Sequence, residues 1–184
     1  MGALNLNHLY AQAGTFTVLV TVIDKDGGAG SNAQNPFVVT VRIANHPPAC
    51  TAATPSASLL WPPNHQWASI GINGVSDPDG DATAVTITGI FQDEPVDGVA
   101  DGDMAPDGAG VGTSIAQVRA ERAGNPKVPG NGRVYHISFS AIDGKGGSCS
   151  GEVKVGVPRD QSAASLPPVD DGALYNSITG GKRQ

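Results

Sequence analysis

The chain has 184 residues, with 17 acidic and 11 basic side chains and a formal net charge of −6 at neutral pH. This balance argues against nucleic-acid binding, which depends on Lys and Arg side chains that neutralise phosphates. No apolar run is long enough to enter and cross a membrane, and the first residues lack the regions of a signal peptide. The length suits one full domain with part of another, or two small domains.

The first segment, residues 1–45, predicts two strands. Residues 15–24 alternate between larger apolar and polar side chains, and residues 36–43 form a second β-rich run. The Lys-Asp-Gly-Gly turn at 25–28 begins the connection between them, so we expect a hairpin with a long loop. Two consecutive prolines at 47–48 mark a linker after it.

The second segment, residues 46–161, predicts several short strands separated by Gly- and Pro-rich turns. No stretch has the period of a long amphipathic helix, which predicts an all-β fold of the β-sandwich type. The expected strands cover residues 57–63, 67–75, 82–91, 114–122, 133–143 and 150–157.

The two cysteines, Cys50 and Cys149, lie at opposite ends of this second segment. A structural zinc site needs four ligands and no CxxC motif is present, so a disulfide is the favoured interpretation. Two unrelated buried thiols are the alternative. A disulfide requires an oxidising compartment, and closing a loop of about 100 residues would stabilise the fold by roughly 4–5 kcal/mol.

A tight acidic loop follows the expected strand at 67–75. Asp77, Asp79 and Asp81 alternate with a proline and a glycine, and no Lys or Arg occurs between Arg42 and Arg119. Three neighbouring carboxylates need a positive counter-charge, and Ca²⁺ takes oxygen ligands of this kind. We therefore predict a calcium site here, with a solvated polar turn as the alternative.

A second acidic stretch lies between residues 92 and 112. It is a second candidate calcium site, although its spacing does not match an EF-hand loop and a flexible solvated loop explains it equally well. Its acidic residues are Asp93, Glu94, Asp97, Asp101, Asp103 and Asp107.

An internal repeat relates the two segments. Residues 20–28 and 138–147 both contain a strand that ends in Ile-Asp, followed by a turn with Gly-Gly and a further alternating strand. The second copy closes a domain that begins about 100 residues earlier, whereas the first copy lies almost at the N-terminus. Residues 1–44 therefore resemble only the last two strands of a sandwich.

Two family resemblances follow from these motifs. The pattern His8-x-Tyr10, Gly-Thr-Phe-Thr-Val at 14–18 and Val-Ile-Asp-x-Asp-Gly-Gly at 22–28 is similar to the C-terminal half of PKD domains. Residues 60–65 (Leu-Trp-Pro-Pro-Asn-His), 77–81, 92–95 and 143–149 resemble Ig-like repeat modules of large secreted bacterial proteins. The resemblances imply an Ig-like sandwich over 46–161, preceded by an incomplete PKD-like segment over 1–45. In an Ig-like sandwich the corresponding loops meet at one end, so we expect Asp143 to join the acidic loop at 77–81.

The two ends of the chain predict that it associates with other modules or with copies of itself. A lone two-stranded hairpin is marginal in water, and its open edge needs covering. Either the chain is a piece of a longer protein, or another chain supplies strands. The tail, residues 162–184, has a composition typical of disorder; the alternative is a short added strand at 174–178. Head-to-tail contacts between such ends would build open filaments.

No catalytic motif is present. The four histidines show no HExxH spacing, and no GxSxG motif occurs. Asp93 and Glu94 could form the carboxylate pair of a glycosidase. Acid-rich turns explain these two residues more simply, because nothing else in the sequence indicates a sugar-binding cleft. Trp61 and Trp67 favour core or corner packing over a sugar-stacking platform. The sequence therefore predicts a non-catalytic, calcium-stabilised module at the bacterial cell surface. It would act as a stalk, an adhesive repeat or a fibre subunit beside copies of itself or adjacent modules. The alternative is an accessory carbohydrate-binding module of a secreted hydrolase.

Overall fold

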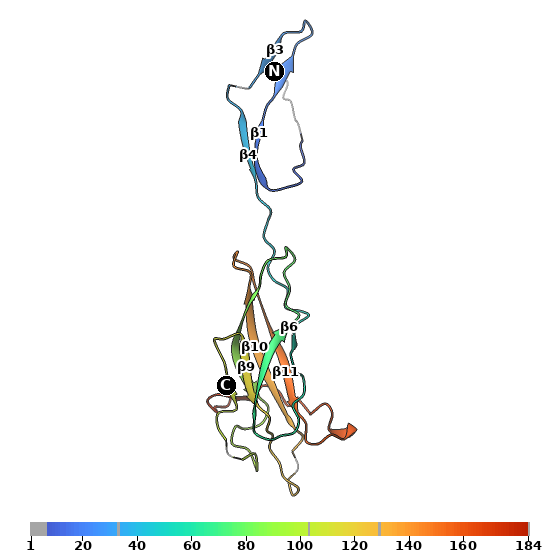
Figure 1. The fold of residues 1–184 in the computed structure, drawn as a ribbon, viewed down its shortest axis with the longest axis vertical. Coiled ribbons are helices and arrows are strands. Elements are labelled where there is room, and N and C mark those ends of the chain that lie inside the picture. The colour runs from blue at the N-terminus through green and yellow to red at the C-terminus, as the bar shows by residue number, and fades with distance from the viewer. Residues whose placement is uncertain (1–6, 33, 103, 129, 184) are drawn as a thin grey trace. The chain divides into compact units, whose positions relative to one another are not determined.

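The protein is built almost entirely from antiparallel strands, as the sequence predicts. A computed structural model describes residues 7–32, 34–102, 104–128 and 130–183. The chain divides into two compact units, Met1–Ala44 and Asn45–Gln184 (Figure 1). Among the described residues no helix is long and apolar enough to pass through a bilayer.

Unit 1 is one continuous hairpin with two ladders. Strand β1 (Gly14–Val18) pairs with β4 (Phe37–Val41), and β2 (Thr21–Ile23) pairs with β3 (Ala29–Ser31). The expected long loop is wrong in its length, because β3 pairs back onto β2 directly after the glycine turn. Between the ladders, Asn32 accepts from the Val20 amide at 2.6 Å and donates to the Val18 carbonyl at 3.1 Å.

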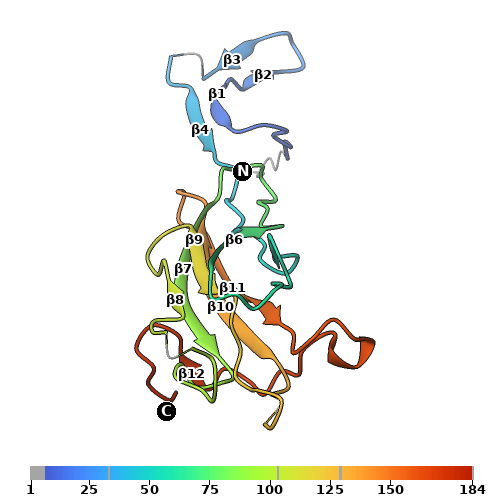
Figure 2. The ribbon, with the colours of Figure 1, turned by 60° about the horizontal axis from the view of Figure 1, so that its bottom comes forward.

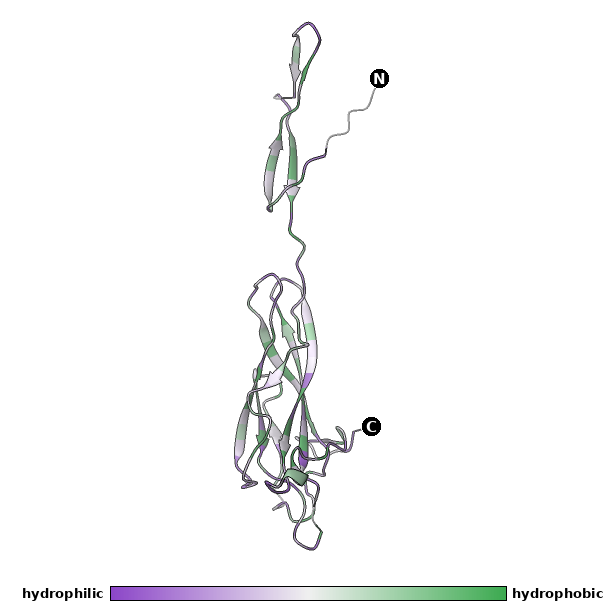
Figure 3. Cartoon of the chain, turned by 90° about the vertical axis from the view of Figure 1, so that its right-hand side faces the viewer, coloured by the Kyte–Doolittle hydropathy of each residue, from purple (hydrophilic) through white to green (hydrophobic). Residues whose placement is uncertain are grey.

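The hairpin of unit 1 leaves much of its apolar surface in water. The Tyr10 ring lies 4.7 Å from the Phe16 ring and covers part of one face. In the described part of this unit no second sheet covers the strands, whose apolar segments are seen in Figure 3. The large apolar side chains that stay exposed are Leu9, Leu19, Val22, Ile23, Phe37, Val38 and Ile43.

Unit 2 is a sandwich of two four-stranded sheets (Figure 2). The first sheet has the order β11–β10–β7–β12, with β7 (Ala84–Gln92), β10 (Arg133–Ile142), β11 (Ser148–Val157) and β12 (Tyr175–Asn176). The second has the order β5–β6–β9–β8, with β5 (Thr54–Pro55), β6 (Trp67–Asn73), β8 (Gly108–Ala109) and β9 (Ile115–Arg119). These strands confirm the all-β sandwich.

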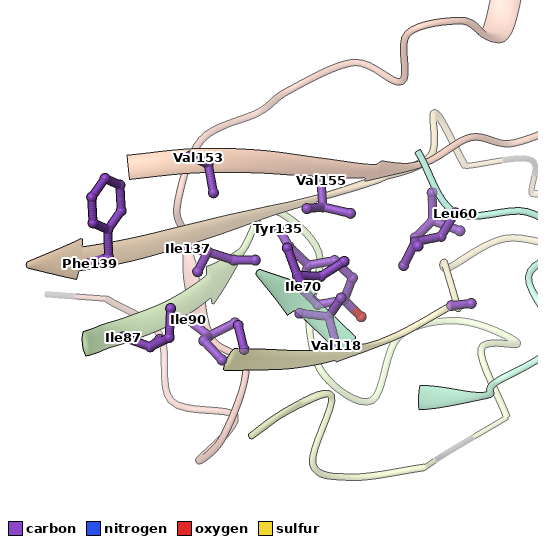
Figure 4. Packing of buried hydrophobic residues seen from close by; sticks show 13 residues of the cluster. Leu60, Ile70, Ile87, Ile90, Val118, Tyr135, Ile137, Phe139, Val153 and Val155 are labelled. Atoms are coloured by element: carbon purple, nitrogen blue, oxygen red, sulfur yellow. The ribbon is translucent and has the colours of Figure 1, made fainter. Parts of the chain in front are cut away.

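Alternating side chains of the central strands form the core between these sheets. Tyr135, Ile137 and Phe139 of β10 point inward and are at most 1% exposed. Figure 4 shows Tyr135 beside Ile70 of β6 and Val118 of β9, so both sheets contribute to one cluster. Because side chains alternate across a strand, the sequence period of two places Tyr135, Ile137 and Phe139 on one face, while the first five residues of β10 are buried whichever face they lie on.

The predicted disulfide is present. Cys50 and Cys149 are bonded, with their Cα atoms 5.9 Å apart and a sequence separation of 99. The bond connects the segment that enters unit 2 to β11. A short bridge between Ala49 and Ser76 holds the same segment to the loop that follows β6.

The described tail residues, 162–183, fold onto unit 2. The disorder expected from their composition is wrong, and the alternative of a short strand within 174–178 is confirmed, because the tail backbone finds partners on a sheet edge. Tyr175 pairs with Gln92 of β7. The Ser177 carbonyl accepts from the amides of Asp107 and Gly108, both at 2.9 Å. The tail therefore connects the edges of the two sheets. Near its start the tail forms a single 3₁₀ turn, η1 (Ala163–Ser165).

Candidate cation site and buried charge cluster

The acidic loop between β6 and β7 brings its three carboxylates together. One oxygen each from Asp77, Asp79 and Asp81 lies within 4.8 Å of the others. The loop closes on the Asp77 side chain, which accepts from the Asp79 amide at 2.8 Å and the Asp81 amide at 3.4 Å. Gly80 has φ +78°, a conformation that favours glycine. We call these three carboxylates the aspartate triad.

A lysine and a histidine from distant parts of the chain reach the triad. The Lys145 ammonium lies 2.6 Å from Asp81 Oδ1, and this hydrogen bond raises the pKa of Lys145. His46 donates its backbone amide to Asp79 Oδ2 at 2.7 Å, and its Nδ1 lies 2.9 Å from Asp79 Oδ1. The hydrogen bond from the His46 backbone amide is the main cause of the lowered pKa of Asp79. The hydrogen bond between the two side chains raises the pKa of His46. The triad is therefore partly neutralised within the chain.

Part of the triad still lacks a partner. Asp77 Oδ2 and Asp81 Oδ2 are buried atoms without a hydrogen bond in the structure. A buried acceptor without a donor is unfavourable, and a bound cation would remove that cost. The geometry of the triad is thus compatible with a hard cation that shares the loop with Lys145.

Asp143 does not join the ligand atoms of the triad. Its Oδ1 accepts from the amides of Lys145 at 2.7 Å and Gly147 at 2.9 Å, and its Oδ2 accepts from Asn45 Nδ2 at 2.7 Å. The Asn45 bond is the main cause of its lowered pKa. The turn between β10 and β11 does approach the triad as expected, but it contributes the Lys145 ammonium.

The second acidic stretch surrounds a buried arginine. Arg133, the first residue of β10, is 0% exposed. Its guanidinium donates to Asp107 Oδ2 at 2.6 Å, Glu121 Oε1 at 3.0 Å, Glu94 Oε2 at 3.1 Å and Asp101 Oδ2 at 3.4 Å. We call these five residues the Arg133 cluster. A guanidinium is a fork of donors suited to several carboxylates, so it takes the place that the sequence analysis gave to calcium.

The other predicted ligands of this stretch lie apart from Arg133. Asp93 is buried and accepts from the Val134 amide at 2.9 Å and the Asp171 amide at 3.4 Å, and burial raises its pKa to about 6. Asp97 is exposed. Asp103 lies outside the described residues. The stretch is thus split between an arginine site and a contact with the tail.

Asp107 and Glu121 share one guanidinium nitrogen. Both carboxylates are fully buried, and both accept from Nη1 of Arg133. Burial, together with the hydrogen bond to Glu121, raises the pKa of Asp107 to about 7. On its other side, Glu121 lies 3.2 Å from His65 Nδ1. The contribution of Arg133, Glu121 and His65 to this site was not predicted from the sequence, because they follow or precede the acidic stretch by many residues.

Of the expected core or corner packing of the two tryptophans, the core alternative is wrong. Trp61 is 44% and Trp67 40% exposed, so neither is a core residue. The Arg119 guanidinium lies over the Trp67 ring, 4.3 Å from its centroid. Arg119 also donates to the Pro106 carbonyl at 2.8 Å, which holds it in place.

Comparison with known proteins adds no relative: no protein-family model, curated protein or solved structure matches the chain. The PKD-like and Ig-like resemblances therefore remain predictions that rest on the motifs themselves.

Proposed function

We propose that this protein is a non-catalytic, extracellular structural module of the Ig-like type, a stalk or adhesive repeat or the subunit of a surface fibre. The observation that supports it is the unfinished apolar surface of unit 1, where Phe37, Val22 and Ile23 are each more than 60% exposed. A hairpin of this kind is marginal alone and is stabilised by added strands. An adjacent module of a longer chain, or a neighbouring copy, would supply them by strand complementation.

The disulfide supports an extracellular location. Disulfides persist in oxidising environments and are rare in the cytosol. Bonding Cys50 to Cys149 stabilises a domain with few large aromatic core residues. A surface location at a bacterial cell is the setting that the Ig-like resemblance implies.

Calcium is proposed as the ligand of the aspartate triad. Its binding would satisfy Asp77 Oδ2 and Asp81 Oδ2. A ligand that binds only the native state stabilises it by mass action. Lys145 holds the other oxygen of the Asp81 carboxylate, Oδ1, so its positive charge lies beside the proposed ion and weakens calcium binding.

Particle size across concentration tests the assembly proposal. We expect static light scattering of the full chain to show association that increases with concentration, and Phe37→Lys to abolish it. A matched control is Val111→Lys, since Val111 is exposed in unit 2. A particle that remains monomeric at every concentration, with calcium and with EDTA, would overturn assembly through unit 1 by copies of this chain.

The exposure of the tryptophans favours one second candidate function, an accessory carbohydrate-binding module. Aromatic faces in water can stack on sugar rings, and Arg119 holds the Trp67 ring in a fixed position. We expect polysaccharide pull-down by the wild type and loss of binding in Trp61→Ala and Trp67→Ala if this candidate is right. No retention on any polysaccharide excludes it.

A further inference from the structure

A cavity of about 440 Å³ lies at the end of unit 2 that is opposite the aspartate triad. The strands place it there, because β9 ends at Arg119, which pairs with the first residue of β6, whereas the triad comes after the last residue of β6. Its walls are the loop after β9, the two residues that follow Pro158, and Ala100. Small-molecule sites have volumes of about 300–1,000 Å³, so this cavity suits a ligand of one sugar ring or one amino acid.

Two guanidinium groups line this cavity, and a local hydrogen bond holds each of them. Arg122 Nη1 donates to the carbonyls of Ala123 at 3.2 Å and Gly124 at 3.3 Å. Arg159 Nε donates to Asp160 Oδ2 at 3.0 Å. In the part of the chain that the structure describes, Nη2 of Arg122 and both terminal nitrogens of Arg159 donate to no other group. These N–H groups are available to a ligand, and we call the site the arginine cavity.

The loop that carries Arg122 is closed by backbone contacts. The Gly124 amide donates to the Val99 carbonyl at 2.7 Å, and the Asn125 amide donates to the Val128 carbonyl at 2.9 Å. Gly124 has φ +113°, and a Cβ at this position would clash with the amide nitrogen of Gly130. The loop is therefore formed before any ligand arrives, so binding needs little further ordering of the chain.

The walls of the arginine cavity carry one net positive charge. Two guanidiniums are set against the single carboxylate of Asp160. Asp160 accepts from the Ser162 amide at 2.8 Å, and its hydrogen bonds with Ser162 hold the pKa of its carboxyl far below the ordinary value, so it stays ionised. A monoanion balances this charge, whereas a phosphate with nearly two charges meets repulsion from Asp160. A carboxylate is a monoanion whose two oxygens match the fork of a guanidinium.

We propose that the arginine cavity binds the carboxylate group of a small organic ligand between Arg122 and Arg159. The terminal N–H groups of the two guanidiniums donate to the carboxylate oxygens. Ala100 and Pro126 are apolar and contact the body of the ligand. An acidic sugar and an acidic amino acid both carry this group. The site uses neither the triad nor unit 1, so it gives unit 2 a binding role that is independent of the proposed structural one.

Titration of the full chain with two small carboxylates tests the proposal. Glucuronate represents the acidic sugar and N-acetylglutamate α-amide the acidic amino acid, and glucose and N-acetylglutamine amide are their uncharged counterparts. We expect at least one carboxylate to bind with a Kd of about 1 mM, given the usual contribution of each atom in a small ligand. The backbone resonances of Arg122 and Arg159 should shift on binding. The uncharged counterparts should leave them unchanged, and the carboxylate that binds identifies the source of the group.

Variants of the two arginines locate the bound carboxylate. Arg122→Met and Arg159→Met should each weaken binding by about tenfold or more, because each removes charge-assisted hydrogen bonds to it. Arg159→Lys keeps the charge without the planar fork and should recover only part of the affinity. The matched control is Lys127→Met, which removes an exposed cation of the same loop that does not line the cavity, and it should change nothing.

Three results would overturn the proposal. One is that neither carboxylate binds. Another is an equal loss of affinity in Lys127→Met and Arg159→Met, which would show that the ligands only follow surface charge. The third is tighter binding of inorganic phosphate than of both carboxylates, which would contradict the charge balance with Asp160. Arg159 pairs with Asp160 near the surface, where ion pairs contribute little to stability, so Arg159→Met decides the test even if Arg122→Met does not fold.

Discussion

Replacing Arg133 by methionine removes the shared cation of the buried cluster while keeping an apolar side chain of similar reach. Asp101, Asp107 and Glu121 then remain fully buried without the guanidinium that they contact in the native fold. The substitution creates no large cavity. Its effect therefore reports the electrostatic role of the guanidinium rather than packing.

The loss in the free energy of unfolding at neutral pH can be calculated in two ways. Removing one partner of a buried ion pair costs about 3–5 kcal/mol. The alternative is to protonate a carboxyl, and with an ordinary pKa near 4 this costs about 1.4 kcal/mol per pH unit, or about 4 kcal/mol at pH 7. We expect Arg133→Met to lower the free energy of unfolding by about 4 kcal/mol. The midpoint of a domain of this size then falls by roughly 10 °C.

Urea unfolding at pH 5 and pH 7 measures this loss. Trp61 and Trp67 both belong to unit 2 and report its unfolding by fluorescence. Carboxyls with a raised native pKa bind protons in the fold, so their penalty grows as pH rises above about 4. The loss should therefore shrink to about 1–2 kcal/mol at pH 5. The control is Arg159→Met, whose partner Asp160 is exposed. A loss below about 1 kcal/mol at pH 7, or an equal loss at both pH values, would refute the reasoning.

Three further predictions concern the disulfide, the triad and the tail. Replacing both cysteines by alanine should lower the unfolding free energy by about 4–5 kcal/mol, because Cys50 and Cys149 are 99 residues apart; urea unfolding measures it, and no change would contradict loop closure. Lys145→Met should strengthen calcium binding in a calorimetric titration, because it removes the ammonium 2.6 Å from Asp81; weaker binding would show that Lys145 organises the loop instead. Asp170→Asn should speed amide exchange over residues 174–178, because Asp170 loses the ammonium at 2.6 Å and the imidazole at 2.8 Å. Although burial opposes it, the lysine hydrogen bond lowers the pKa of Asp170 to about 2, so wild-type protection should be present above about pH 4 and lost as pH falls towards 2.

Local pattern was sufficient to predict the disulfide and most of the strands. The strand expected over 57–63 is wrong, because that segment makes only an isolated bridge at Leu59 and the short strand β5 lies before it. The alternation of residues 133–143 gives β10 and the face that packs into the core, since a period of two is a property of the strand itself. It does not give the burial of Val134 and His136 on the opposite face. The two cysteines leave few alternatives in a domain without zinc motifs. The pairing of the tail with a sheet edge was harder to predict from the sequence, because the strand Tyr175–Asn176 contributes only two paired residues.

The charge cluster could not be placed from local pattern. Glu94, Asp101, Asp107 and Glu121 are spread over 28 positions and meet only because the strands fold around Arg133. One signal was present: a long acidic stretch with no Lys or Arg requires a counter-cation from elsewhere. Calcium was the counter-cation expected from the sequence, whereas the fold brings in Arg133.

Lys145 illustrates the same limit at the aspartate triad. The repeat at residues 138–147 predicts the turn that carries it, and the Ig-like resemblance predicts that this turn approaches the acidic loop. Asp143 is held away from the triad's ligand atoms by Asn45 and by the backbone amides of Lys145 and Gly147, so Lys145 is the group that arrives. No sequence period determines a contact of that kind.

The disulfide also decides which part of unit 2 would bear a mechanical load. If the chain were pulled between Asn45 and its tail, tension would pass from Cys50 directly into β11 through the covalent bond. The strands between the two cysteines would lie outside the loaded path. A separation of 99 residues corresponds to ~340 Å of extended chain that could not be drawn out while the bond is intact. Under load β11 and the tail of such a module would unfold, while the strands between the two cysteines would stay folded.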